Sequence, residues 1–163
     1  MNDREPLAYF ITFTVYGTFL QGDSRGWVSR RMRAEKPQPL LQQWHRRRLR
    51  HEVLLLTPQQ RSAVEKETRR LCEFRGWTLW EVNARTNHVH SVISAFRHSG
   101  ETVRNQLKAN CTRALRERWP VFANRPVWSV GGDWQCINSE HDLNQVVLYA
   151  GAVQDRKSRD GTK

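Results

Sequence analysis

Two histidines separated by one residue, in the stretch "NHVHSVI" at 87–93, are the first side chains of this sequence that could do chemistry. Residues two apart in a β-strand point to the same side of the sheet, so His88 and His90 would project together. Neutral imidazole is a common ligand of divalent metals. The pair therefore has two interpretations: ordinary strand residues, or half of a metal site that needs a third ligand from elsewhere in the chain.

The charge of the chain favours a polyanionic partner. Its 163 residues include 27 Lys and Arg against 16 Asp and Glu, which gives a formal net charge of +11. Such a field attracts nucleic acid first and acidic membrane surfaces second. A metal site on a nucleic-acid-binding domain suggests phosphoryl transfer, in which an oxygen nucleophile attacks a phosphate.

Tyr149 is the candidate for that nucleophile. It lies in the last predicted helix, which opens at the S-x-x-D capping pattern of residues 139–142. The apolar face of this helix consists of Leu143, Val146, Val147, Ala150 and Val153. Tyr149 falls at the flank of this face, so it would either pack there or border a cleft.

The elements that must position these residues follow from hydrophobic patterning and turn chemistry. Strands are predicted at 9–16, 77–85, 88–95 and within 125–138, where Gly131 and Gly132 allow a bend. Helices are predicted from the Thr57-Pro58 start to about 74, over 101–118, and from 139 through 149. This order predicts an α+β ferredoxin-like sandwich, with an antiparallel sheet of four to five strands and helices on one face.

The length fits a single domain over 1–163, with a basic and partly irregular insertion at about 22–52. Three widely separated cysteines at 72, 111 and 136 indicate neither a disulfide framework nor a thiolate metal site, so a reduced cytoplasm is expected. The sequence starts with charged residues rather than a signal peptide, and no apolar run approaches the about 18 residues of a membrane span. No membrane partner is expected.

Several motifs, taken in order, resemble those of the HUH single-strand transposases with one catalytic tyrosine, and in particular the group related to REP-associated tyrosine transposases. The motifs are "YGTFLQGDSRGW" after the first strand, "NHVHSVI" on a strand, "LKANCTRAL" on a helix, "VWSVGGDWQCIN", and a tyrosine on the closing helix. The likeness extends from about residue 9 to residue 154. This order of pieces is much more specific than the two histidines alone.

The resemblance implies that His88 and His90 bind Mg²⁺ or Mn²⁺ and that Tyr149 attacks a phosphate of single-stranded or hairpin DNA. The products would be a 5′-phosphotyrosine and a free 3′-hydroxyl, and reversal on another strand would complete strand transfer. Covalent attachment conserves the phosphodiester energy, so cutting and rejoining need no ATP. Action as a monomer and action as a homodimer that exchanges helices both stay open.

The third metal ligand departs from the family pattern. The family places Gln or Asn four residues after the tyrosine, where this chain has Val153, and Gln154 follows one position later. With about 3.6 residues per turn, Gln154 lies about 140° from Tyr149 on an ideal helix. A distortion at Gly151 would restore the geometry. We expect Gln154 to be the third ligand, with Gln145 as the fallback.

Single strands are held by cationic grooves that also offer aromatic side chains for stacking. The candidates lie in the basic insertion and on the polar side of the 101–118 helix: Arg25, Trp27, Arg30, Arg31, Arg46, Arg47, Lys108 and Arg116. None of them specifies a target sequence.

Three other functions are compatible with parts of this pattern. A nucleic-acid-binding module of ferredoxin-like fold would explain the charge without catalysis. A replication initiator or plasmid relaxase would share the HUH chemistry, but such proteins typically carry further domains. A two-histidine phosphoesterase would need a second H-x-S/T motif, and only the 88–90 pair lies in a suitable predicted strand.

Overall fold

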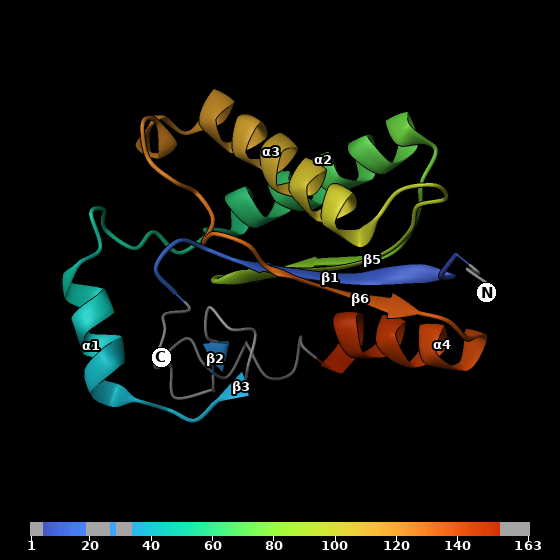
Figure 1. The fold of residues 1–163 in the computed structure, drawn as a ribbon. Coiled ribbons are helices and arrows are strands. Elements are labelled where there is room, and N and C mark those ends of the chain that lie inside the picture. Colours follow the sequence, from blue (N-terminus) through green and yellow to red (C-terminus); the bar gives the residue numbers. More distant parts are fainter. Residues whose placement is uncertain (1–4, 19–26, 29–33, 154–163) are drawn as a thin grey trace.

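The computed structural model describes residues 5–18, 27–28 and 34–153, with side chains at 5–18 and 35–151 (Figure 1). The strands are β1 (Ala8–Thr14), β2 (Trp27–Val28), β3 (Ala34–Glu35), β4 (Thr78–Ala84), β5 (His88–Ser94) and β6 (Asp133–Ile137). The helices are α1 (Pro39–Arg47), α2 (Pro58–Arg75), α3 (Gly100–Arg118) and α4 (Glu140–Leu148). A 3₁₀ turn, η1 (Pro120–Phe122), follows α3, and a π-helical turn, η2 (Tyr149–Val153), continues α4.

The main sheet has four strands in the order β4-β5-β1-β6, and all its pairings are antiparallel. Figure 1 shows α2 and α3 lying across one face of this sheet, and α4 lying against the opposite face beside β6. This arrangement confirms the predicted α+β ferredoxin-like sandwich with its antiparallel sheet. The placement of α4 differs from the expected helices on one face, because its apolar side chains pack against a separate cluster on the second face. None of the helices in the described part of the chain is long and apolar enough to cross a membrane.

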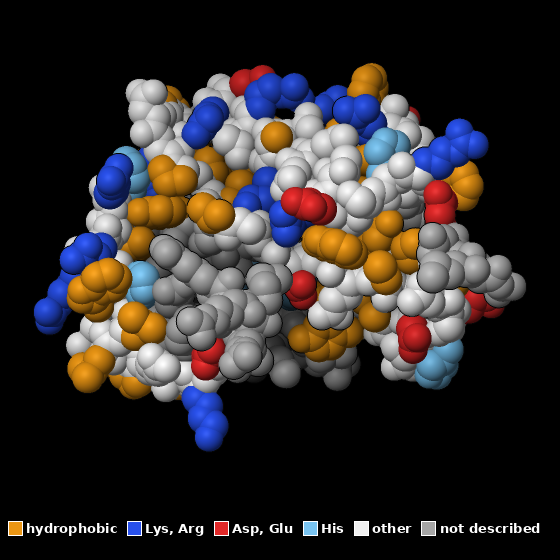
Figure 2. Space-filling view, in the orientation of Figure 1, with side chains coloured by type: hydrophobic (Ala, Val, Ile, Leu, Met, Phe, Trp, Pro, Cys, Tyr) orange, Lys and Arg blue, Asp and Glu red, His pale blue; other side chains and the backbone are white. Residues whose placement is uncertain are grey.

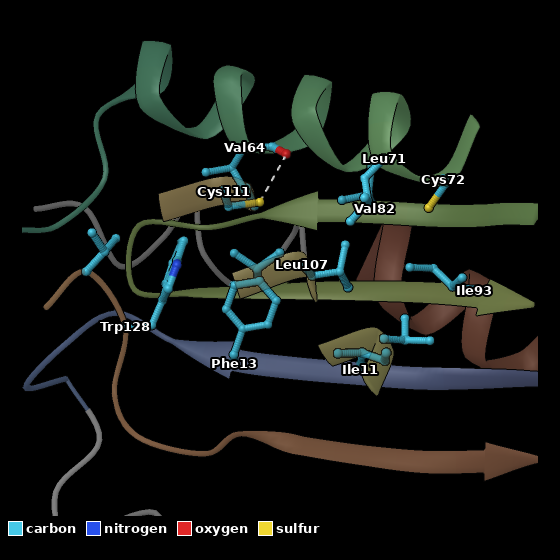
Figure 3. Packing of buried hydrophobic residues seen from close by; sticks show 14 of the residues in the cluster. Ile11, Phe13, Val64, Leu71, Cys72, Val82, Ile93, Leu107, Cys111 and Trp128 are labelled. Carbon is cyan, nitrogen blue, oxygen red and sulfur yellow. Dashed lines mark hydrogen bonds between the residues drawn. The ribbon is translucent and has the colours of Figure 1, made fainter. Parts of the chain in front are cut away.

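The larger hydrophobic core fills the space between the sheet and the α2–α3 layer. Ile11 and Phe13 of β1 are 0% and 1% exposed there, and the Phe13 ring meets the Trp128 ring edge-on at 4.8 Å. Figure 3 shows these side chains with Leu107 of α3 above them. Because side chains alternate along a strand, this core fixes which residues of β1 and β5 must face the other side.

A smaller apolar cluster holds the closing helix on the opposite face. Its buried members are Ala8, Val92, Ile137 and Ala150. Leu143, Val146 and Val147 of α4 pack against it, as the predicted apolar face of that helix requires. The cluster covers only part of this face. Thr12, His90 and Asn83 lie on the same face outside the cluster.

The basic insertion contains more regular structure than expected. Where the sequence indicates a partly irregular segment at 22–52, the structure has the short β2–β3 pair and helix α1. Helix α1 begins with Pro39 and has no buried residue, although Leu40, Leu41 and Trp44 share one side of it. The signals available in the sequence were this apolar spacing, Pro39 at the first position and the basic last turn.

Helix α2 begins as the sequence predicts. The Thr57 hydroxyl accepts a hydrogen bond from the Gln60 amide at 3.2 Å, and the Gln60 side chain accepts one from the Thr57 amide at 3.0 Å. This reciprocal capping box satisfies two donors that a helix start leaves without partners. At the other end, Gly76 adopts φ 70°, a left-handed conformation that closes the helix.

We expect Thr57→Ala to lower the free energy of unfolding by about 1 kcal/mol, because the cap loses its side-chain acceptor. Urea denaturation followed by circular dichroism measures the change. Gln59→Ala in the same first turn is the matched control, since Gln59 is exposed and takes no part in the cap. Equal effects of the two substitutions would contradict the role of the capping box.

Candidate active site

A row of polar residues crosses the sheet on the face that carries α4. The pairing register places Asn83 of β4, His90 of β5, Thr12 of β1 and Asp133 of β6 opposite one another in turn. Residues directly opposite on adjacent strands share a face and lie within contact distance. Asn83 and His90 of this row are buried, at 7% and 8% exposure, whereas Asp133 is exposed.

The two histidines lie together, as the strand spacing predicts. Their ring centroids are 4.5 Å apart. The Nδ1 atom of His90 is 2.9 Å from the Thr12 hydroxyl, and the Nδ1 atom of His88 is 2.5 Å from Oδ1 of Asn87. Metal-binding imidazoles are commonly oriented by such a contact at one ring nitrogen while the other nitrogen coordinates. The arrangement therefore suits coordination through Nε2.

The surroundings of His90 keep its imidazole neutral. The residue is 8% exposed, and burial lowers its pKa from 6.5 to about 3, with further lowering by the nearby charges of His88 and Arg85. Protons therefore do not compete for the ring nitrogens at neutral pH. Neutral imidazole is the form that binds metals.

Tyr149 stands next to this pair. It ends α4 and begins η2, and it is 44% exposed. Its ring centroid is 6.3 Å from that of His90 and 6.3 Å from that of Phe10. Phe10 in turn stacks on His90 at 5.3 Å, so the three rings form one cluster. The Tyr149 ring is thus both near the His90 ring and partly exposed.

The closing helix is distorted around Tyr149. The five residues of η2 form a π turn that contains Gly151, the residue that could allow such a distortion. The hydrogen bonds of a π turn join residues five apart, where those of an α-helix join residues four apart. The residue five positions after the first therefore lies near the side that the fourth would occupy in an α-helix. Gln154 itself lies outside the described residues. Gln145 is exposed on α4, and its backbone carbonyl accepts from the Tyr149 amide.

Within the described part of the chain, no group of three or more His, Cys, Asp or Glu residues could hold a metal. A metal held by the histidine pair would therefore need a third ligand of another type. A third protein ligand of another type, such as an amide oxygen, fits this donor set, because imidazole and oxygen ligands together suit Mn²⁺ and related metals.

Two of the predicted DNA-binding residues lie in the helical layer, away from the histidine face. The Lys108 ammonium donates to the carbonyls of Ser129 and Gly131 at 2.8 and 2.7 Å. Burial, and to a lesser extent Arg104, lowers its pKa. Arg116 donates to the carbonyls of Phe122 and Arg125. The structure shows both cations bound to backbone carbonyls, and their role in DNA binding stays a prediction.

Two others lie on α1. Arg46 and Arg47 are exposed in its last turn, and the guanidinium of Arg48 lies 4.0 Å from the ring centroid of Trp44, which is 48% exposed. Figure 2 shows Lys and Arg side chains at the edge of the molecule that carries α1 and over the α2–α3 layer. Arg25, Arg30 and Arg31 lie outside the described residues, as does the side chain of Trp27.

Sequence reasoning missed several residues of the ring cluster and its surroundings. Thr12 and Phe10 were assigned to a strand without a role, although their alternation with Ile11 and Phe13 already places them on the face opposite the main core. Arg85 is 4% exposed, and its charge lies close enough to affect His90. Its burial had no signal in the sequence, where Arg is usually exposed.

The fold and this site define a class: a ferredoxin-like domain with a two-histidine strand facing a tyrosine on a closing helix. Solved structures that share the fold include two transposases. A candidate transposase from Deinococcus radiodurans R1 has a TM-score of 0.54, 14% identity, and coverage of 91% of this chain and 92% of that one. A REP-associated tyrosine transposase bound to a REP hairpin has a TM-score of 0.53, 11% identity, and coverage of 90% and 66%.

No family model and no curated protein matches the sequence. The two structural neighbours nevertheless show that the chain has the fold of REP-associated tyrosine transposases, as the sequence motifs indicated, at low identity. Likeness at this level concerns the fold.

We expect Thr12→Val to weaken Mn²⁺ binding by about 10- to 100-fold, because His90 loses the contact that orients its ring. Isothermal titration of the protein with Mn²⁺ measures the affinity. Thr112→Val is the matched control, since the Thr112 hydroxyl also makes one hydrogen bond, to the Lys108 carbonyl in α3. Unchanged affinity in Thr12→Val would contradict an orienting role for Thr12.

Proposed function

We propose that this protein is a metal-dependent enzyme that nicks single-stranded DNA and transfers the strand through a 5′-phosphotyrosine on Tyr149. The observation that carries the proposal is the approach of the Tyr149 ring to the His90 ring, at 6.3 Å between centroids, with the phenol partly exposed. A tyrosine that served packing alone would have its ring buried in the apolar cluster. Here Ala150, the next residue, takes that place at 0% exposure.

The reaction needs only the phenol and the DNA to balance. The Tyr149 oxygen forms a bond to phosphorus as its proton leaves, and the bond from phosphorus to the 3′-oxygen breaks. That oxygen takes up a proton and becomes the free 3′-hydroxyl. Attack by a 3′-hydroxyl on the phosphotyrosine reverses each step, which joins strands and restores the phenol.

His88 and His90 would hold the divalent metal, with Gln154 as the proposed third ligand and Gln145 as the alternative. The π turn at 149–153 supports Gln154, because it offsets the extra residue between the tyrosine and this glutamine. When bound, Mg²⁺ or Mn²⁺ supplies charge stabilisation at the phosphate oxygens. The protein's part is to present neutral imidazoles, orient them through Thr12 and Asn87, and hold the phenol beside them.

The proposed substrate is a single strand next to a hairpin. The net charge of +11 supports a nucleic acid partner. The structure bound to a REP hairpin, whose fold this chain shares, supports a hairpin. The exposed basic last turn of α1, together with Trp44, offers the combination of cations and an aromatic ring that single strands require.

We expect Tyr149→Phe to abolish the covalent protein–DNA adduct while leaving DNA affinity unchanged, because only the nucleophilic oxygen is removed. The assay incubates the protein with a labelled hairpin that carries single-stranded flanks, in Mn²⁺, and resolves denaturation-resistant adducts by gel electrophoresis. Tyr16→Phe is the matched control, since the Tyr16 hydroxyl contacts the Arg50 amide at 3.1 Å, outside the ring cluster.

The adduct should form with the parent protein and Tyr16→Phe, and chelation of the metal should prevent it. An adduct that survives in Tyr149→Phe would contradict the assignment of the nucleophile. DNA binding by all three proteins without any adduct would favour a binding module of the same fold.

A further inference from the structure

We infer that Asn83 is a positioning residue, which fixes the π turn η2 and thereby holds Tyr149 beside the histidine pair. This inference rests on the proposed function for its catalytic meaning. The contact between Asn83 and η2 is a property of the fold and can be tested by itself.

The side-chain amide of Asn83 reaches from β4 to the backbone of η2. Its Nδ2 donates to the carbonyl of Ala150 at 2.9 Å and to that of Gly151 at 3.3 Å. Carbonyl oxygens only accept hydrogen bonds, so the nitrogen and not the oxygen of the amide must face the turn. Asn83 is 7% exposed, which shields both hydrogen bonds from water.

The turn needs such a partner because the carbonyls at the end of a helix have no intrahelical donors. A π turn is also a rare conformation, which packing must hold in place. The Ala150 methyl group is buried in the apolar cluster, and the Ala150 carbonyl accepts the hydrogen bond from the Asn83 side chain. Both contacts are made by Ala150, the residue that follows Tyr149, so they fix the backbone from which the Tyr149 side chain extends.

The strand register joins this anchor to the metal half-site. Asn83 and His90 are direct partners in the β4–β5 pairing and share the α4 face. Cβ atoms of such partners lie about 4.5–5.5 Å apart. One hairpin therefore carries both the proposed metal ligand and the group that fixes the backbone next to the nucleophile, so the two cannot move independently.

A second contact of β4 with η2 supports this arrangement. A Cβ atom at Gly151 would lie 2.9 Å from Oε2 of Glu81, so the backbone of the turn runs close against this side chain. Glu81 and Asn83 are two residues apart on β4 and both reach η2. The turn η2 thus packs against two side chains of β4, those of Glu81 and Asn83.

Nucleophilic attack is sensitive to small displacements of the nucleophile. A misplacement of about 1 Å costs about 100-fold in rate. If Asn83 positions the phenol, its loss should lower the rate of adduct formation at saturating DNA and leave the affinity for DNA and for Mn²⁺ unchanged. A residue that served stability alone would change the fraction of folded protein rather than this rate.

The experiment compares the full chain with Asn83→Ala and Asn83→Asp, the second of which keeps the shape but removes both donors. Single-turnover adduct formation with the labelled hairpin and Mn²⁺ should be about 100-fold slower in each, at a temperature where both are folded. Asn110→Ala is the matched control, because the Asn110 amide donates to the Gln106 carbonyl at 2.8 Å within α3. It should react at the parent rate.

Amide hydrogen exchange provides a readout that does not depend on activity. Asn83→Ala should accelerate exchange at 149–153 and leave 100–118 unchanged. Unaltered exchange in η2, or adduct formation at the parent rate, would overturn the inference. If the parent protein forms no adduct, the proposed function fails, while faster exchange in η2 would still support Asn83 as the anchor of the turn.

Discussion

The antiparallel pairing of β5 with β1 and β4 is the constraint on which the site depends. Val89 and Ile93 of β5 are 1% and 0% exposed in the main core, so His88 and His90 must face the other side. A slip of one residue would exchange the two sets and place imidazoles in the apolar core. The core therefore fixes the site from the opposite face of the sheet, and the same register sets Thr12 and Asn83 beside His90.

The face that carries the site combines a small apolar cluster with a polar row. The cluster seats α4 and η2, and the row supplies an imidazole, a hydroxyl, an amide and a carboxylate. Phe10 connects the two, since it packs against the cluster and stacks on His90. Burial at this boundary keeps His90 neutral, while Tyr149 stays 44% exposed.

Local signals in the sequence predict most of this fold, because each acts within a few residues. The capping box of α2, the β4–β5 hairpin and the shared face of the histidines are examples. Helix α1 was missed because its apolar residues, Leu40, Leu41 and Trp44, lie within an arginine-rich segment. The Lys108 contacts and the Asn83 anchor depend on carbonyls at 129–131 and 150–151, and only the folded chain brings them near.

Manganese anomalous scattering from crystals soaked in Mn²⁺ would test most directly whether the imidazoles and the phenol serve one centre. We expect a peak bonded to Nε2 of both His88 and His90, with the Tyr149 hydroxyl facing it. A peak bound elsewhere, no peak at saturating Mn²⁺, or a phenol turned away from the metal would contradict this expectation.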